Sequence, residues 1–280
     1  MSAAGARVAP ATGQVARAVR AANAQGRAAL VVYLPAGYPD MATSQACLEA
    51  AADAGADLLE VGFPYSDPLM DGPTIQAACQ VALDQGYTPR DDLAMCADLT
   101  QRTAVPALVM TYYNLVWHYG GVDRLDHFAA DAAAAGLTGA ILPDLPAAEG
   151  QPWARAAAAH GLDTVFLAAP ASREQALDAI AQVTTGFVYA TSTMGVTGAR
   201  TALGADAQPL VERLRARTDK PVCVGLGVSN RAQAAEVAGF ADGVIVGSAV
   251  VRAAGEGGAP AVAELVADLA AGCREGHAAR

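Results

Sequence analysis

The chain has 280 residues, of which 53% are hydrophobic, and a formal net charge of -10 at pH 7. It contains no cluster of Lys or Arg, so we expect neither nucleic acid nor a membrane as its partner, although backbone amides could still bind a small phosphorylated molecule. The five cysteines are scattered without a C-x-x-C pair, and no run of 18 apolar residues occurs, which predicts a soluble cytoplasmic protein with reduced thiols.

The N-terminal segment, residues 1–28, is rich in Ala and lacks the continuous apolar stretch of a signal peptide. We expect it to form an extension with a first helix, and residues 29–280 to form one domain. Short apolar runs in this domain predict eight strands, separated by helical patterns of ten or more residues. The predicted strands are residues 29–34, 57–62, 106–112, 139–143, 163–168, 186–190, 221–225 and 242–246.

Four of these strands follow an Ala-rich helical segment that ends at a glycine, namely Gly55, Gly136, Gly161 or Gly239. Glycine suits the position just after a helix, and continuous apolar strands indicate a parallel sheet buried on both faces. Eight strands that alternate with helices predict a (β/α)8 TIM barrel rather than a doubly wound open sheet. A dinucleotide-binding fold would also need a G-x-G-x-x-G turn after the first strand, where the sequence has YLPAGYPD.

An acid interrupts the second predicted strand, in the sequence LLEVGFPYSDPLMDGPTIQ (58–76). Alternation puts Glu60 on the same side as Gly62, and Asp71 lies in the loop beyond, at the end of the barrel that carries active sites. A carboxyl group among apolar side chains has a raised pKa, whereas one in a polar loop stays ionised, and this contrast suits an acid/base pair. The structural alternatives are a buried ion pair for Glu60 and a cap from Asp71 for the helix that starts at Pro73.

The seventh and eighth predicted strands each break into a glycine turn followed by a helix start, in VGLGVSN (224–230) and VIVGSAVV (244–251). Glycine turns after the last two strands form the phosphate site in many barrels of this type. Glycine also serves plain tight turns, which is the alternative interpretation.

A third loop, STMGVTGAR (192–200), follows the sixth predicted strand, which contains Tyr189. Its glycines predict a mobile lid in which Thr197 and Gly198 reach a ligand. The alternative is a flexible loop without a role in binding.

The positions of Lys and His in the sequence disfavour two further types of catalysis. The only lysine, Lys220, lies just before the seventh strand, at the end of the barrel away from the expected site, which disfavours Schiff-base chemistry. The four histidines, His118, His127, His160 and His277, show no metal-ligand spacing. Cleavage of a carbon–carbon bond would therefore rely on carboxylates and on a substrate that accepts electrons itself.

Five segments together resemble the tryptophan synthase alpha chain family, in the same order along nearly the whole sequence. They are LLEVGFPYSDPLMDGPTIQ (58–76), MTYYNLV (110–116), LPDLP (142–146), GVTG (195–198) and GSAVV (247–251). The resemblance implies a lyase that cleaves indole-3-glycerol phosphate to indole and glyceraldehyde 3-phosphate without a cofactor of its own. It also implies a tryptophan synthase beta chain as partner, which carries pyridoxal phosphate, receives the indole and forms an allosteric α2β2 heterotetramer with the alpha chain.

The resemblance also implies roles for individual residues. Glu60 matches the general acid/base, and Asp71 matches the carboxylate that binds the indole N–H. The implied substrate-binding positions are Tyr189, Thr197, Gly198, Leu226, Gly227, Gly247 and Ser248, and those at the interface with the beta chain are Asp67, Pro68 and Asn114. Two positions depart from the family's pattern: Leu30 stands where an aromatic residue often lines the indole pocket, and Thr193 stands where some members carry Arg.

Other functions remain open from the sequence. A free-standing lyase would release indole without a partner. A non-catalytic subunit would only bind phosphorylated ligands, and the absence of either Glu60 or Asp71 would have favoured it. Another phosphate-binding barrel, such as a sugar-phosphate isomerase, would leave the long motif around Asp71 unexplained.

Overall fold

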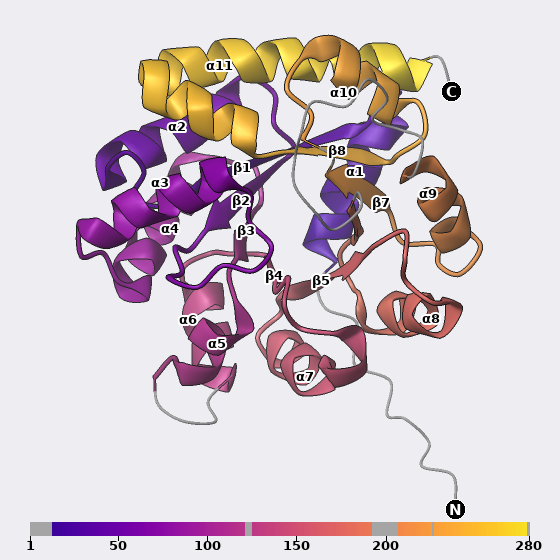
Figure 1. Ribbon diagram of the computed structural model, residues 1–280, viewed down its shortest axis with the longest axis horizontal. Coiled ribbons are helices and arrows are strands. Elements are labelled where there is room, and N and C mark those ends of the chain that lie inside the picture. Colours follow the sequence, from indigo (N-terminus) through magenta and orange to yellow (C-terminus); the bar gives the residue numbers. More distant parts are fainter. Residues whose placement is uncertain (1–12, 121–124, 192–206, 226, 279–280) are drawn as a thin grey trace, which may run out of the picture.

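The computed structural model describes residues 13–120, 125–191, 207–225 and 227–278. Within these ranges, eight parallel strands close into a barrel, in which each strand pairs with the next along the chain and the last strand pairs with the first. Figure 1 shows most of the helices around the outside of the strands. The predicted (β/α)8 TIM barrel is confirmed.

The strands are short and largely buried, as parallel strands covered on both faces must be. They are β1 (Ala29–Pro35), β2 (Leu58–Gly62), β3 (Ala107–Met110), β4 (Gly139–Ile141), β5 (Asp163–Ala168), β6 (Val188–Thr191), β7 (Val222–Gly225) and β8 (Gly243–Val246). All of them overlap the strands predicted from the sequence. The largest differences are at β3 and β6, and β3 ends at Met110 because Thr111 and Tyr112 already lead into the next helix.

The helices follow the strands in regular alternation, with additional helices after β2 and β3. They are α1 (Gln14–Ala24), α2 (Met41–Asp53), α3 (Pro73–Asp84), α4 (Pro89–Arg102), α5 (Tyr113–His118), α6 (Leu125–Ala134), α7 (Gln151–Ala159), α8 (Glu174–Val183), α9 (Ala207–Arg215), α10 (Arg231–Ala238) and α11 (Ser248–Ala278), with a 3₁₀ helix η1 (Ala147–Glu149) before α7. A non-helical residue, Gly258, divides α11. None of the described helices is long and apolar enough to cross a membrane.

Strand alternation separates two apolar layers. One layer fills the barrel interior and includes Val31, Leu58 and Ile245. The other lies between the strands and the surrounding helices and includes Leu59 and Val61. The direction in which a strand residue points therefore decides whether it faces the barrel interior or the helices.

Helix α1 covers the end of the barrel at which the strands begin, and its Val15 and Val19 join the interior apolar layer. The buried carboxylate of Asp163 on β5 holds the start of this helix. It accepts hydrogen bonds from the backbone N–H groups of Gly13 at 3.2 Å and Val15 at 2.9 Å. With this end of the barrel filled, the opposite end is where a substrate can enter. The division into an extension at residues 1–28 and a barrel domain stays a prediction.

Three of the four glycines predicted to follow helices have the expected left-handed conformation. Gly55, Gly136 and Gly161 have φ angles of 113°, 78° and 74°. Gly239 differs, with φ of -64°, because the helical turn continues past it and Ala241 N–H still donates to an earlier carbonyl oxygen at 2.9 Å.

Candidate active site

Glu60 lies inside the barrel, in the middle of β2. Its strand neighbour Leu59 packs toward the helices, while Leu58 belongs to the interior layer, so alternation turns the Glu60 side chain inward. Its register partner on β1 is Tyr33, which faces the same interior. The carboxyl group of Glu60 and the phenol of Tyr33 therefore lie side by side in the barrel interior, next to the interior apolar layer.

The environment of Glu60 favours its protonated form. The residue is 2% exposed, and its Oε2 has no hydrogen-bond partner within the described part of the chain. Burial and then the negative charge of Asp71 raise the pKa of Glu60 to about 8. None of the ion pairs between described residues includes Glu60, so a structural salt bridge does not explain why an acid stands here.

Asp71 lies in the loop between β2 and α3 and is less deeply enclosed. Burial raises its pKa to about 6, while a hydrogen bond from the Tyr112 hydroxyl counteracts this rise. The alternative role of Asp71 as a cap for α3 is wrong: the N-cap residue is Gly72, and no side chain caps this helix. The helix terminus therefore does not use the carboxylate of Asp71.

Two tyrosines stand on either side of the barrel mouth. Tyr33 lies over Gly62 of β2, and Tyr189 lies over Gly225 of β7, so closely that a Cβ atom at either glycine would overlap the phenol. Burial is the main reason why the pKa values of both tyrosines are raised well above their usual range, and the nearby charge of Glu60 adds to it. Both phenols are therefore neutral and can donate hydrogen bonds.

The predicted phosphate residues lie at the ends of the last two strands. Gly247 follows β8 directly and Ser248 begins α11, so unpaired N–H groups of this helix start face the end of the barrel. Gly227 has φ of 74° and open space around it. The turn after β7 does not lead straight into a helix, because α10 begins only at Arg231. Leu226, Thr193, Thr197 and Gly198 lie outside the described residues.

The residues expected at a partner interface lie on two adjoining segments. Asp67 is exposed and Pro68 half-buried in the loop between β2 and α3, and Leu69 beside them is 81% exposed. Asn114, exposed on α5, donates a hydrogen bond from Nδ2 to the hydroxyl of Tyr65 at 2.9 Å, which joins α5 to that loop. This part of the surface thus adjoins the loop that carries Asp71.

Comparisons with known proteins agree over nearly the whole chain. The family model for the tryptophan synthase alpha chain matches residues 19–278. The chain belongs to the tryptophan synthase alpha chain family. A relative from Streptomyces coelicolor, named tryptophan synthase alpha chain, is 52% identical over 262 residues, which cover 91% of this chain and 94% of the relative.

Solved structures show the same similarity in three dimensions. A structure of Mycobacterium tuberculosis tryptophan synthase matches with a TM-score of 0.86 and 50% identity, covering 92% of this chain and 97% of that one. A structure from Pyrococcus furiosus, described as the tryptophan synthase a2b2 complex, matches with a TM-score of 0.79 and 36% identity, covering 87% and 98%. The reaction of this family is the retro-aldol cleavage of indole-3-glycerol phosphate, and the chain is a lyase of tryptophan biosynthesis.

The expectation about Leu30 is wrong. Leu30 is fully buried in the layer between the barrel and the helices, because it alternates with Val31 and faces outward. The aromatic residue that β1 contributes to the interior is Tyr33, three positions later. Alternation along β1 places Tyr33 and Leu30 on opposite sides of the strand, but the sequence alone does not show which side faces the interior. Tyr112 gave no comparable signal, because its contact with Asp71 depends on how two loops meet.

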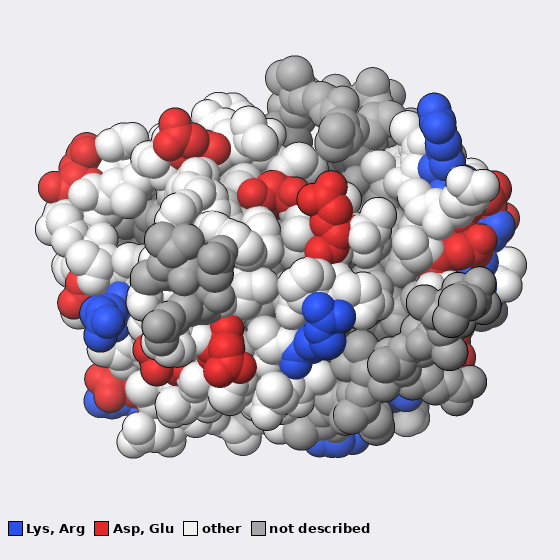
Figure 2. All heavy atoms as spheres, turned by 90° about the horizontal axis from the view of Figure 1, so that it is seen from below, with Lys and Arg blue, Asp and Glu red and all other residues white. Residues whose placement is uncertain are grey.

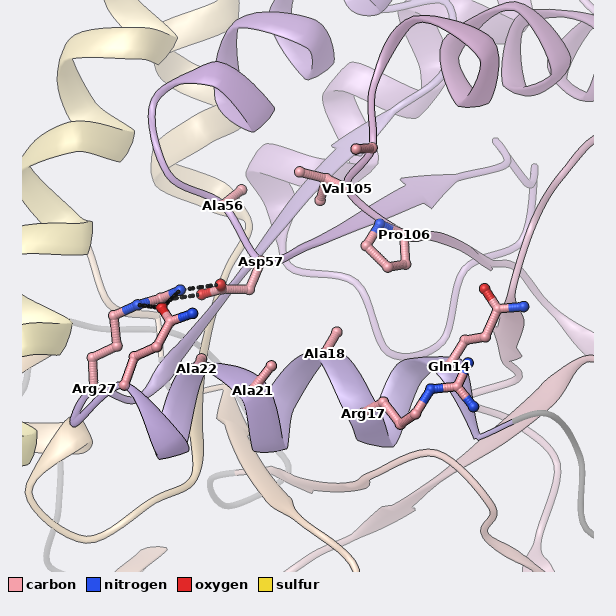
Figure 3. Close-up of a pocket in the computed structure, with 12 residues that line it drawn as sticks. Gln14, Arg17, Ala18, Ala21, Ala22, Arg27, Ala56, Asp57, Val105 and Pro106 are labelled. Carbon is pink, nitrogen blue, oxygen red and sulfur yellow. Dashed lines mark hydrogen bonds and ion pairs between the residues drawn. The ribbon is translucent and has the colours of Figure 1, made fainter.

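A groove of about 450 Å³ lies at the opposite end of the barrel, between α1 and the segments that precede β2 and β3. Figure 3 shows Ala18, Ala21 and Pro106 along it, with Arg27 and Asp57 paired at one end. The two guanidinium–carboxylate contacts are 2.5 and 2.7 Å long. This pairing leaves neither charge available for chemistry, so the groove does not compete with the mouth around Glu60 as an active site.

The face drawn in Figure 2 is mostly uncharged, with acidic and basic side chains dispersed over it singly or in small groups. Among the described residues on this face, Lys and Arg do not gather into a stripe of the kind that binds nucleic acid. The absence of a nucleic-acid partner stays a prediction.

Proposed function

We propose that Glu60 and Asp71 carry out the cleavage of indole-3-glycerol phosphate in this chain. The observation that supports this role is the contrast between the two carboxyl groups. The pKa of Glu60 is about 8 and that of Asp71 about 6, so near neutral pH one holds a proton and the other is mainly ionised. Environments that push two carboxyl pKa values apart are characteristic of acid/base pairs.

The steps follow from this difference. Protonated Glu60 donates its proton to the indole ring carbon that bears the glycerol chain, which leaves positive charge on the ring nitrogen. Asp71 accepts a hydrogen bond from the ring N–H and stabilises that charge. The carboxylate of Glu60 then takes the proton of the adjacent chain hydroxyl as the carbon–carbon bond breaks, and the bond electrons return to the ring. The products are indole and the aldehyde, and Glu60 regains its starting state.

The substrate phosphate is held by backbone N–H groups in this proposal. Gly247 and Ser248 provide the start of α11, and Gly227 allows the chain after β7 to approach closely. The positive end of the helix dipole favours an anion at this point. Neither glycine turn contains Lys or Arg, so no side-chain cation is required. Tyr189, and from outside the described residues Leu226, Thr197 and Gly198, complete the proposed binding site.

The proposed partner is a tryptophan synthase beta chain, in an α2β2 assembly in the cytoplasm. Support comes from the Pyrococcus furiosus structure, whose description names mutual activation of an a2b2 complex. The proposed contact surface includes Asp67, Pro68 and Asn114, beside the exposed Leu69. In this proposal pyridoxal phosphate belongs to the beta chain, and the alpha reaction needs no cofactor because the protonated indole ring accepts the electrons.

The deciding experiment measures indole release from indole-3-glycerol phosphate, with and without a beta chain. We expect slow release by the chain alone and faster release in the complex. Full activity without any response to a beta chain would instead favour a free-standing lyase. No release under either condition would leave a non-catalytic, ligand-binding subunit.

A further inference from the structure

The hydroxyl of Tyr112 lies within the loop that carries Asp71. It accepts a hydrogen bond from the backbone N–H of Met70 at 2.9 Å. The phenol also lies near enough to the Asp71 carboxyl to act on it as a hydrogen-bond donor, which lowers the pKa of that acid. One phenol oxygen therefore links the main chain of the loop to the side chain proposed to bind the indole.

Tyr112 itself is held firmly. It is 3% exposed and ends the segment after β3, where it is the N-cap residue of α5. Its ring stacks on that of Tyr65, with ring centroids 5.0 Å apart and planes inclined by 25°. The hydroxyl of Tyr65 in turn accepts the hydrogen bond from exposed Asn114. Two stacked rings and two hydrogen bonds thus connect the surface of α5 to the loop that carries Asp71.

We propose that Tyr112 is a positioning residue, whose hydroxyl holds the Asp71 loop and carboxylate in the geometry that binds the indole N–H, and that Tyr65 and Asn114 support it from the surface side. The inference rests on the proposed role of Asp71. A carboxylate must be held within a few tenths of an ångström to stabilise charge that develops on a ring nitrogen, and Asp71 lies on a loop rather than on a strand. Tyr112 supplies the fixed point that the loop otherwise lacks.

The hydrogen bond also affects protonation, because a donor stabilises the ionised carboxylate and lowers its pKa. Removing the hydroxyl should therefore raise the pKa of Asp71 above the value in the wild type. Four other titratable groups face Asp71, whose charge raises their pKa values, and each comes from a different element: Tyr33 on β1, Glu60 on β2, Cys79 on α3 and Tyr189 on β6. A test must leave all of them in place.

The substitution Tyr112→Phe meets this requirement, because it keeps the stacked ring and removes only the hydroxyl. The direct measurement is a ¹³C NMR titration of the Asp71 carboxyl in full-length protein, with its signal assigned by its loss in Asp71→Asn. We expect the pKa of Asp71 to rise in Tyr112→Phe. Tyr113→Phe is the matched control, since it removes the neighbouring phenol, whose ring packs on Trp117, and it should leave the Asp71 titration unchanged.

Kinetics test whether Tyr112 acts through Asp71. Tyr112→Phe should lower kcat for indole release roughly 10- to 100-fold and shift the acid limb of the pH–rate profile to higher pH. In an Asp71→Asn background the same substitution should cause little further loss. An unchanged Asp71 titration, or losses that multiply fully in the double variant, would overturn the positioning role. A wild type that releases no indole would refute the proposed function, while the NMR titration would still decide whether Tyr112 controls Asp71.

Discussion

The carboxyl groups of Glu60 and Asp71 lie at the same end of the barrel, and the charge of Asp71 adds to burial in raising the pKa of Glu60. The two groups form a coupled pair in which Asp71 ionises first, because its pKa is about 6 and that of Glu60 is about 8. The ionisation of Asp71 itself helps Glu60 to keep its proton. Near neutral pH, Asp71 is therefore mainly ionised and Glu60 mainly protonated, which is the charge state that the proposed first step needs.

This relationship predicts a bell-shaped pH dependence of kcat/KM, which reports the pKa values of the free enzyme. The value of kcat/KM should rise as Asp71 loses its proton through about pH 6 and fall as Glu60 loses its proton through about pH 8, since the first step needs an ionised Asp71 and a protonated Glu60. The measurement is kcat/KM for indole release, from about pH 5 to about pH 9.5. A rate that still increases above about pH 9 would mean that Glu60 starts the reaction as a base.

Replacing Glu60 by Gln should remove the proton transfer and preserve the shape of the site. We expect kcat to fall by roughly 10²- to 10⁴-fold, while a non-cleavable phosphate-bearing analogue binds as it does to the wild type. Stopped assays of indole and calorimetric titration of the analogue measure the two properties separately. Turnover close to that of the wild type would remove Glu60 from the catalytic role.

The raised pKa of Glu60 also has a cost in stability. The folded protein holds a proton that the unfolded chain releases, so the free energy of unfolding falls as pH rises from the ordinary pKa of 4.5 to about 8. The slope for one such group is at most about 1.4 kcal/mol per pH unit. Glu60→Gln should remove this slope, which urea unfolding across the same pH range can measure.

Asp92 provides the matched control for that experiment. It is buried in α4 outside the site, its Oδ1 has no partner among the described residues, and burial followed by the charge of Asp91 raises its pKa to about 8. Asp92→Asn should flatten the pH dependence of stability in the same sense and leave indole release unchanged. If neither variant changed the slope, both carboxyl groups would be ionised in the folded protein.

The sequence predicts the strands and the position of Glu60 because both depend on local patterns. Apolar runs of strand length mark β1 to β8, and alternation puts Glu60 on the side of its strand that Gly62 shares. Tyr33 needed the same alternation in a neighbouring strand, and its position was misassigned to Leu30 because register between strands is not encoded in one segment. Tyr112 could not be assigned to Asp71 at all, since the contact joins loops that are 41 positions apart in the chain.

The proposed phosphate site predicts that a side chain at position Gly227 weakens substrate binding strongly. Its φ of 74° is unfavourable for a side chain, and a branched side chain would also occupy the space through which the phosphate approaches. Gly227→Val should raise KM at least about 10-fold with a smaller change in kcat, because the phosphate is bound alike in the ground and transition states. Steady-state kinetics over a range of substrate concentrations measure both constants.

Gly26 separates backbone strain from loss of phosphate binding. Its φ is 75°, it also has open space around it, and it precedes β1 at the opposite end of the barrel. Gly26→Val should destabilise the fold about as much as Gly227→Val, on the order of 1–2 kcal/mol, and leave KM unchanged. Equal KM values for Gly227→Val and the wild type would move the phosphate site away from this turn.

The loop between β2 and α3 predicts coupling between substrate and partner. Asp71 on this loop faces the site, whereas Asp67 and Leu69 a few positions earlier are exposed, so one segment can respond to both ligand and partner. An analogue bound at Asp71 should increase the affinity of the chain for a beta chain. By linkage, the beta chain should increase the affinity for the analogue by the same factor, which typically corresponds to about 1–3 kcal/mol. Titrations of a beta chain with and without the analogue measure this factor.

Asp67→Ala should weaken the complex and reduce the factor, whereas Asp98→Ala, at an exposed position on α4, should do neither. Equal affinities with and without analogue in the wild type would eliminate the coupling and leave a lyase that works independently of its partner.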